Sequence, residues 1–165
     1  MDFQEMFKLQ YTLDKRIEKE HGLTGQDLFN DKMLALLVEV GELANETRCF
    51  KFWSDKPASP RDVILEEFVD GVHFILSLGI VLGYNQDFEI PAPTNEKRNG
   101  SPTEKFLEVF DAASQLLKTR NREDYMKLFS VFLELGMILG FTSEDIFQAY
   151  TKKNEINHQR QDEGY

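Results

Sequence analysis

Residues 61–83 read RDVILEEFVDGVHFILSLGIVLG, and their apolar side chains recur at the three- and four-residue spacing of an α-helix. Convincing strand alternation is missing from this stretch and from the rest of the chain. Helix-start signals precede it, because Ser59 can cap the helix, Pro60 suits the first turn and Asp62 favours the positive end of the helix dipole. The pattern therefore predicts one long helix that stops near Gly83.

The same helical spacing continues on both sides of this stretch. Gly22 ends the first helix, a capping box that begins at Ser101 opens the fourth, and Thr142 starts the last. The expected helices cover about residues 3–21, 28–52, 59–83, 101–119, 124–139 and 142–161. We expect a single all-α domain over residues 1–165, a bundle of about six helices in which residues 84–102 form a polar, mobile connector.

One internal similarity relates residues 74–84, FILSLGIVLGY, to residues 131–141, VFLELGMILGF, at an offset of 57. Five of the eleven positions are identical. Two interpretations stay open: two buried helices that each end in a glycine cap, or a duplicated helical hairpin. In a duplication only the first copy keeps its acidic residues, because Lys127 stands opposite Asp70.

The composition excludes several classes of protein. The 165 residues carry 29 Asp and Glu against 19 Lys and Arg, a formal net charge of -10, so no basic surface is left to bind a nucleic-acid backbone. With 41% apolar residues, the chain is not a disordered acidic tail. No apolar run is long enough for a bilayer, and the first ten residues lack a signal-peptide layout. The single cysteine, Cys49, excludes an internal disulfide and fits a reducing compartment, so we expect a cytoplasmic protein.

Two pairs of acidic residues stand on the second and third expected helices. Glu39 and Glu42 form one pair, and Glu67 and Asp70 form the other. A spacing of three places both carboxylates of a pair on one helix face. Because these faces border the apolar stripes, the carboxylates must be paired or hold a cation. Two such helices offer an all-oxygen site that suits Mg²⁺ or Mn²⁺, which bridge phosphate oxygens and activate water.

The last helix contains the one basic segment of this acidic chain. Lys153, Asn157 and Arg160 are spaced four and three apart and form one polar stripe. The two cations could hold phosphates. The alternative is a solvated terminal helix whose cations suit its dipole.

Three further side chains are candidates for contact with a base. Gln10 and Asp14 share one face of the first helix, where an amide could read the edge of a base or belong to an ordinary polar rim. Trp53, expected at the end of the second helix, could stack on a base or serve plain hydrophobic packing.

A di-iron helical bundle is the rival metal site. Such bundles use Glu-x-x-His motifs, and this chain has Glu18 with His21 and Glu155 with His158. Ligands in these bundles project inward, whereas both motifs stand in polar segments. We therefore expect these histidines to face water.

Taken together, the motifs resemble those of one family. Gln10 within LQYTLD, then EVGELANE, FKFW, EEFVDGVHFILSL and the closing KKNEINHQRQDEGY follow the order seen in the all-α dimeric dUTPases, which belong to the MazG-like nucleotide pyrophosphohydrolases. The resemblance covers nearly the whole chain. The acidic pairs mark the wider superfamily, whereas the terminal motif and the Gln10 segment are more specific to the dUTPase branch.

The resemblance implies a role for each matching residue. Mg²⁺ would be bound by the four acids, and one glutamate of the first pair would also orient or deprotonate the attacking water. The implied assignments are Glu39, Glu42, Glu67 and Asp70 to the metal, Lys153, Arg160 and Tyr165 to the phosphates, Asn157 to the nucleotide, Gln10 and Trp53 to uracil, and Phe74 to the deoxyribose. At position 14 the family typically has Asn, so Asp14 leaves room for a different pyrimidine. Family members are homodimers, which implies a homodimer here.

We therefore expect an Mg²⁺-dependent dUTPase that hydrolyses dUTP to dUMP and pyrophosphate through a metal-activated water. Two alternatives stay open. One is a MazG-like pyrophosphohydrolase that acts on dCTP or other nucleoside triphosphates, and the other is a non-catalytic helical interaction protein.

Overall fold

The computed structural model describes residues 1–86 and 100–164, and within them it contains six α-helices and no strand. The helices are α1 (Phe3–Glu20), α2 (Phe29–Thr47), α3 (Arg61–Leu82), α4 (Pro102–Thr119), α5 (Arg122–Ile138) and α6 (Ser143–Asp162). The predicted all-α fold is therefore confirmed. Most of the predicted mobile connector, residues 84–102, lies outside the described residues, and so does Tyr165.

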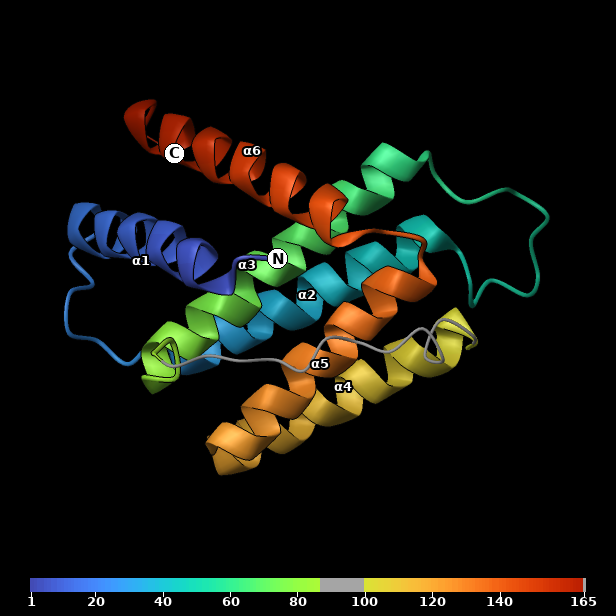
Figure 1. The fold of residues 1–165 in the computed structure, drawn as a ribbon, viewed down its shortest axis with the longest axis horizontal. Helices are drawn as coiled ribbons and strands as arrows, with labels where there is room; N and C mark the ends of the chain where they lie inside the picture. Colours follow the sequence, from blue (N-terminus) through green and yellow to red (C-terminus); the bar gives the residue numbers. More distant parts are fainter. Residues whose placement is uncertain (87–99, 165) are drawn as a thin grey trace.

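The helices form three layers (Figure 1). The antiparallel helices α2 and α3 run through the middle of the molecule, the α4–α5 hairpin covers one side, and α1 and α6 lie side by side on the other. Helix α3 contacts α1, α2, α5 and α6, so it is the central helix of the bundle. This arrangement brings residues of α1, α2, α3 and α6 together.

Two glycines allow α3 and α5 to interlock. A Cβ at Gly71 of α3 would lie 2.5 Å from the ring of Phe132, and a Cβ at Gly136 of α5 would lie 2.5 Å from the ring of Phe68. The two rings stack with their centroids 4.6 Å apart. An aromatic ring of each helix therefore packs directly against a glycine of the other helix, which brings α3 and α5 close together in this part of the core.

The predicted helix caps are confirmed only in part. Thr142 and Asp145 form a reciprocal capping box at the start of α6. Ser101 makes no capping hydrogen bond at the start of α4. Ser59 does not cap α3, because its hydroxyl donates to the carboxylate of Glu46 instead and ties the start of α3 to the end of α2.

Helix α2 ends earlier than predicted. It stops at Thr47 rather than at residue 52, because Arg48 adopts the left-handed backbone conformation, with φ 57°. The Arg48 guanidinium then donates to the hydroxyl of Ser54 at 2.7 Å and to the carbonyl of Lys56 at 3.1 Å. These bonds hold the chain in a loop where the apolar sequence pattern suggested further helix.

The two similar segments, residues 74–84 and 131–141, end in the same way. Gly83 and Gly140 both adopt positive φ, 75° and 86°. In each segment the residue after this glycine donates its N–H to a carbonyl five residues earlier, at 2.8 and 2.9 Å. The shared sequence thus produces the same helix-ending turn, while the duplicated hairpin stays a hypothesis.

Within residues 1–86 and 100–164, no single helix has the length and apolar composition needed to cross a membrane. Helices α5 and α6 meet that criterion only as a pair, and the pair is bent by 108°. The single domain over residues 1–165 and the cytoplasmic location stay predictions.

Candidate functional site

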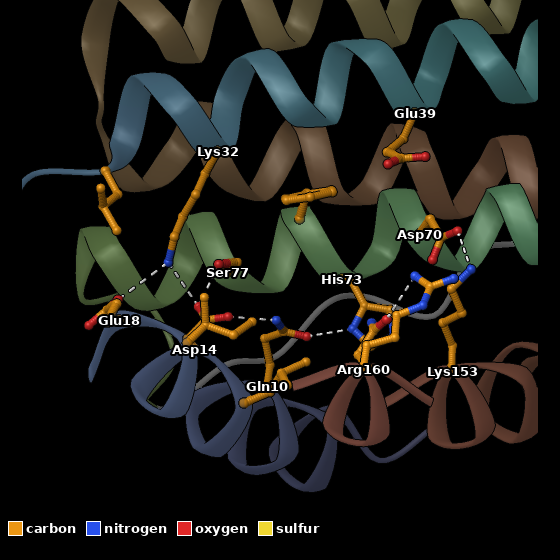
Figure 2. A pocket seen from close by; sticks show the side chains of 15 residues that line it. Gln10, Asp14, Glu18, Lys32, Glu39, Asp70, His73, Ser77, Lys153 and Arg160 are labelled. Carbon is orange, nitrogen blue, oxygen red and sulfur yellow. Dashed lines mark hydrogen bonds and ion pairs between the residues drawn. The ribbon is translucent and has the colours of Figure 1, made fainter. Parts of the chain in front are cut away.

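A cavity of about 270 Å³ lies where α1, α2, α3 and α6 meet (Figure 2). One end is formed by acids of α2 and α3 beside cations of α6, and the other by polar side chains of α1, α2 and α3. Eight of the predicted site residues line it, namely Gln10, Asp14, Glu39, Asp70, Phe74, Lys153, Asn157 and Arg160. The fold therefore gathers residues from both ends of the chain around one cavity.

Three of the four predicted metal ligands come together at the acidic end. Glu39 of α2 and Glu67 and Asp70 of α3 each offer a carboxylate oxygen, and these oxygens all lie within 4.8 Å of one another. We call these three side chains the carboxylate cluster. Glu42 is exposed and lies outside this group, although its negative charge still acts on Glu39 and Glu67.

Burial and mutual repulsion shift the pKa values of the cluster upward. Burial, followed by the negative charges of Asp70, Glu42 and Glu67, raises the pKa of Glu39 to about 7. Burial and the same repulsion raise the pKa of Glu67. Burial also raises the pKa of Asp70, although its hydrogen bond from Lys153 acts in the opposite direction. The cluster thus carries more negative charge than its surroundings neutralise, which is the condition that a bound cation relieves.

Lys153 is the cation of α6 that faces this cluster. Its buried ammonium donates to Asp70 at 2.7 Å and to Glu66 at 2.9 Å. Burial alone would lower the pKa of Lys153, but these two hydrogen bonds raise it overall. One and two turns further along α6, Asn157 and Arg160 also line the cavity, and the Arg160 guanidinium donates to the Asn157 side chain at 3.4 Å.

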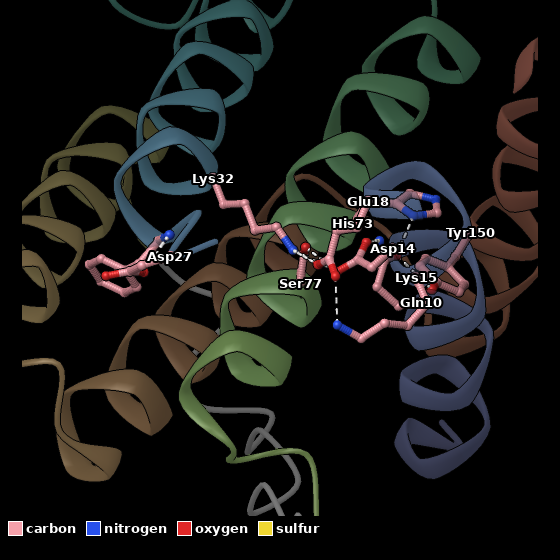
Figure 3. Close-up of polar contacts among 10 residues, drawn as sticks. Gln10, Asp14, Lys15, Glu18, Asp27, Lys32, His73, Ser77 and Tyr150 are labelled. Atoms are coloured by element: carbon pink, nitrogen blue, oxygen red, sulfur yellow. Dashed lines mark hydrogen bonds and ion pairs between the residues drawn. The ribbon is translucent and has the colours of Figure 1, made fainter. Parts of the chain in front are cut away.

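The opposite end of the cavity is organised by Asp14 (Figure 3). One carboxylate oxygen accepts from the Gln10 amide at 2.7 Å. The other accepts from the Lys32 ammonium at 2.9 Å and from the Ser77 hydroxyl. We call these four residues the Asp14 network; it joins α1, α2 and α3.

Gln10 extends this network toward α6. Its amide oxygen accepts from the hydroxyl of Tyr150 at 3.0 Å and lies 2.7 Å from Nδ1 of His73. Burial lowers the pKa of His73 to about 3, so the imidazole is neutral at physiological pH. Because Asp14 accepts from the nitrogen of the Gln10 amide, the oxygen must face His73, which assigns the imidazole proton to Nδ1.

Of the predicted base and phosphate contacts, Trp53 is not found at this cavity. Trp53 neither ends α2 nor lines the cavity; it lies in the loop after α2, is 64% exposed, and packs edge-on against Phe50 and Phe52. The prediction that it ends a helix is wrong, because Arg48 ends α2 first. Tyr165 lies outside the described residues.

Sequence reasoning missed four polar residues that line the cavity, Glu18, Lys32, His73 and Ser77. A signal did exist for His73 and Ser77, since they follow Asp70 by three and seven residues on one face of α3. No such signal marked Lys32, because its partner Asp14 is on another helix.

The di-iron motifs do not form a site. In the described part of the chain, the carboxylate cluster is the only group of three or more potential ligand side chains within 4.8 Å of one another. Glu18 pairs with Lys15 of the same helix at 2.6 Å and with Lys32 of α2 at 3.6 Å, and His21 lies 3.3 Å from the side chain of Gln161 on α6. These residues link α1 to its surroundings rather than to a metal.

Fold and site together define an all-helical protein whose cavity joins an acidic cluster to cationic and hydrogen-bonding side chains. The sequence profile of a dUTPase family matches residues 2–165, and the chain belongs to this family. Membership confirms the resemblance seen in the motifs and assigns dUTP diphosphatase activity, with a nucleotide as substrate. No match is found among curated proteins.

Proposed function

We propose that this chain hydrolyses dUTP to dUMP and pyrophosphate with Mg²⁺ held by the carboxylate cluster, and with Mn²⁺ able to substitute. The observation that carries the proposal is the grouping of Glu39, Glu67 and Asp70 with raised pKa values beside a buried Lys153. Family membership favours this enzyme over a non-catalytic helical interaction protein.

The donor set fits a hard divalent cation. All three groups are carboxylates, and oxygen is the ligand that Mg²⁺ and Mn²⁺ prefer. Lys153 neutralises Asp70 in part, but among the described hydrogen bonds and ion pairs none joins Glu39 or Glu67 to a cationic side chain. When bound, Mg²⁺ supplies positive charge to the phosphate oxygens and increases the acidity of a water molecule.

The chain's own side chains would bind and orient the nucleotide around this cluster. Lys153 and Arg160 line the cavity near the acids and would bind phosphate oxygens, with Tyr165 as a further candidate. Asn157 would contact the nucleotide, and half-buried Phe74 would pack against the deoxyribose. The far end, with Gln10, would hold the base.

We assign the proton acceptor for the attacking water to Glu42. A carboxylate that holds a cation has little affinity for a proton, whereas Glu42 lies outside the cluster and is exposed. It is also close enough for its charge to raise the pKa values of Glu39 and Glu67. Glu39 would then serve as a ligand.

A homodimer is the second part of the proposal. Neighbouring helices α2 and α4 leave large apolar side chains exposed, namely Leu34, Val38, Leu107, Phe110 and Leu117. Exposed apolar groups at helical spacing on two adjacent helices are typical of a subunit interface. Light scattering of Leu107→Asp at micromolar concentration should show monomers where the native protein is a dimer.

Pyrophosphate release from a panel of deoxynucleoside triphosphates, with and without Mg²⁺, tests the catalytic proposal. We expect turnover of dUTP that requires Mg²⁺ or Mn²⁺ and is abolished by a chelator. Preferred turnover of dCTP would instead identify the MazG-like alternative, and turnover in the presence of chelator would contradict the metal assignment.

A further inference from the structure

We infer that Lys32 is a specificity-determining residue that reads the 4-oxo group of the pyrimidine and rejects a 4-amino group. The inference rests on the proposed function, since it takes the acidic end of the cavity as the place of the phosphates. Lys32 lines the opposite end, its side chain is 12% exposed, and its ammonium is 2.9 Å from Asp14.

The spacing of the two ends matches the length of a nucleotide. Lys32 precedes Glu39 by seven residues on α2, and Ser77 follows Asp70 by seven residues on α3. Seven residues of helix span about 10 Å. A nucleoside monophosphate whose phosphate lies at the carboxylate cluster therefore extends its base to Lys32.

A count of hydrogen-bonding groups shows what this end offers a ligand. Both oxygens of Asp14 already accept, one from Gln10 and the other from Lys32 and Ser77. The oxygen of the Gln10 amide already faces His73 and Tyr150. The Glu18 carboxylate also lines this end, and its oxygens pair with Lys15 at 2.6 Å and with Lys32 at 3.6 Å. The groups left for a ligand are therefore donors: one of the three ammonium N–H groups of Lys32, since Asp14 and Glu18 face the other two, and the second amide N–H of Gln10.

A donor-rich end selects a base rich in carbonyl oxygens. Uracil has two, at positions 2 and 4, whereas cytosine replaces the second with an amino group that is itself a donor. An amino group at this position would leave the Lys32 N–H without an acceptor in a buried site. We expect discrimination of at least about tenfold from this contact.

A cycle of two substrates and two enzymes tests the inference. The substrates are dUTP and the triphosphate of 2-pyrimidinone deoxyriboside, which lacks the 4-oxo group, and the reaction is Mg²⁺-dependent pyrophosphate release. The native protein should lose at least about tenfold in kcat/KM with the analogue. In Lys32→Met the two substrates should differ by less than about threefold, and the same variant should use dCTP relatively better.

Lys15→Met is the matched control. Lys15 also pairs with the Glu18 carboxylate, at 2.6 Å, but it does not line the cavity and its side chain is 47% exposed. This variant should keep the native discrimination. Equal discrimination in Lys32→Met and in the native protein overturns the inference while leaving the proposed function intact.

Lys32→Met leaves the buried Asp14 without its cation and could fail to fold, which circular dichroism would show. In that case Asp14→Asn combined with Lys32→Met supplies the test, because the uncharged amide introduced on α1 still offers an oxygen to Gln10 or Ser77. This double variant should show the same loss of discrimination. If the native protein does not hydrolyse dUTP with Mg²⁺, the proposed function fails first and the role of Lys32 falls with it.

Discussion

The two ends of the cavity both hold acidic side chains, yet only one end is neutralised within the chain. Asp14 accepts from an ammonium, an amide and a hydroxyl, so both of its oxygens are paired within the chain. At the other end three carboxylates lie within 4.8 Å of one another, and Lys153 bonds to only one of them. We call the Asp14 network the paired end of the cavity and the carboxylate cluster the unpaired end. The paired end is organised before any ligand arrives, whereas the unpaired end needs a cation from solution.

Under the proposed function, this difference would separate base recognition from chemistry along one cavity. The Asp14 network fixes its side chains by contacts among α1, α2 and α3, which would give the proposed base a preorganised surface. The carboxylate cluster instead keeps raised pKa values and an unsatisfied negative charge, which suits a divalent cation that arrives with the nucleotide. Variants of the carboxylate cluster should therefore affect turnover, and variants of the Asp14 network should affect stability and selectivity.

The largest expected effect is on turnover at the unpaired end. Asp70→Asn removes one of the proposed metal ligands and the closer carboxylate partner of Lys153, so kcat should fall by about a thousandfold. Helical content by circular dichroism should stay native. Glu66→Gln is the matched control, because Glu66 bonds to the same lysine but its side chain is 59% exposed and it stands outside the cluster. Similar rates for both variants would contradict the metal assignment.

The next largest effect is on stability at the paired end. Asp14→Ala removes the closer of the two carboxylates that pair with the buried Lys32 and leaves only Glu18, at 3.6 Å, so urea unfolding should show a loss of about 3 kcal/mol. Glu20→Ala, on the same helix, removes the partly exposed pair with Arg16 and should cost less than about 1 kcal/mol. If Asp14→Ala were as mild as Glu20→Ala, the network would not be the organising contact of this end.

The same contrast explains how much of the molecule the sequence predicted. Helical spacing and the Thr142 cap are local features, so all six helices could be predicted within a few residues. The end of α2 could not, because Phe50 and Phe52 continue the apolar pattern into an exposed loop. What stops the helix there is the backbone of Arg48, held by contacts to a later turn.

The candidate site divides in the same way. The carboxylates of the unpaired end come in pairs spaced three apart, so a local pattern could indicate them. Lys32 stands between Asp31 and Met33 with no local sign of its role, and its partner Asp14 belongs to another helix. Paired networks between helices depend on tertiary packing, which one-dimensional spacing does not record.

A smaller effect is expected where the substrate bridges the two ends. Arg160→Ala should raise KM for dUTP by about tenfold and change kcat much less, because a phosphate contact made before the reaction contributes mainly to binding. Lys152→Ala is the control, since Lys152 is exposed on the same helix and does not line the cavity. A large fall in kcat with unchanged KM would instead place Arg160 at the reacting phosphorus.

The smallest effect concerns the charge of the metal-free cluster and its dependence on pH. Because the pKa of Glu39 is about 7 in the folded chain against an ordinary value of 4.5, ionisation opposes folding, and stability is lost as the pH rises between these values. In chelator, the free energy of unfolding of Glu39→Gln should therefore rise relative to that of the native protein from about pH 5 to pH 7 and level off above.

Mg²⁺ should remove or reverse this gain in stability, because the native cluster then binds a cation. Glu66→Gln should show the opposite sign at lower pH, since the hydrogen bond from Lys153 lowers the pKa of Glu66, and the stability that its charge contributes is lost only as the pH falls below the ordinary value of 4.5. If the free energies of unfolding of the native protein and Glu39→Gln changed in parallel between pH 5 and pH 7, the cluster would carry no uncompensated charge. The contrast between the two ends of the cavity would then not hold.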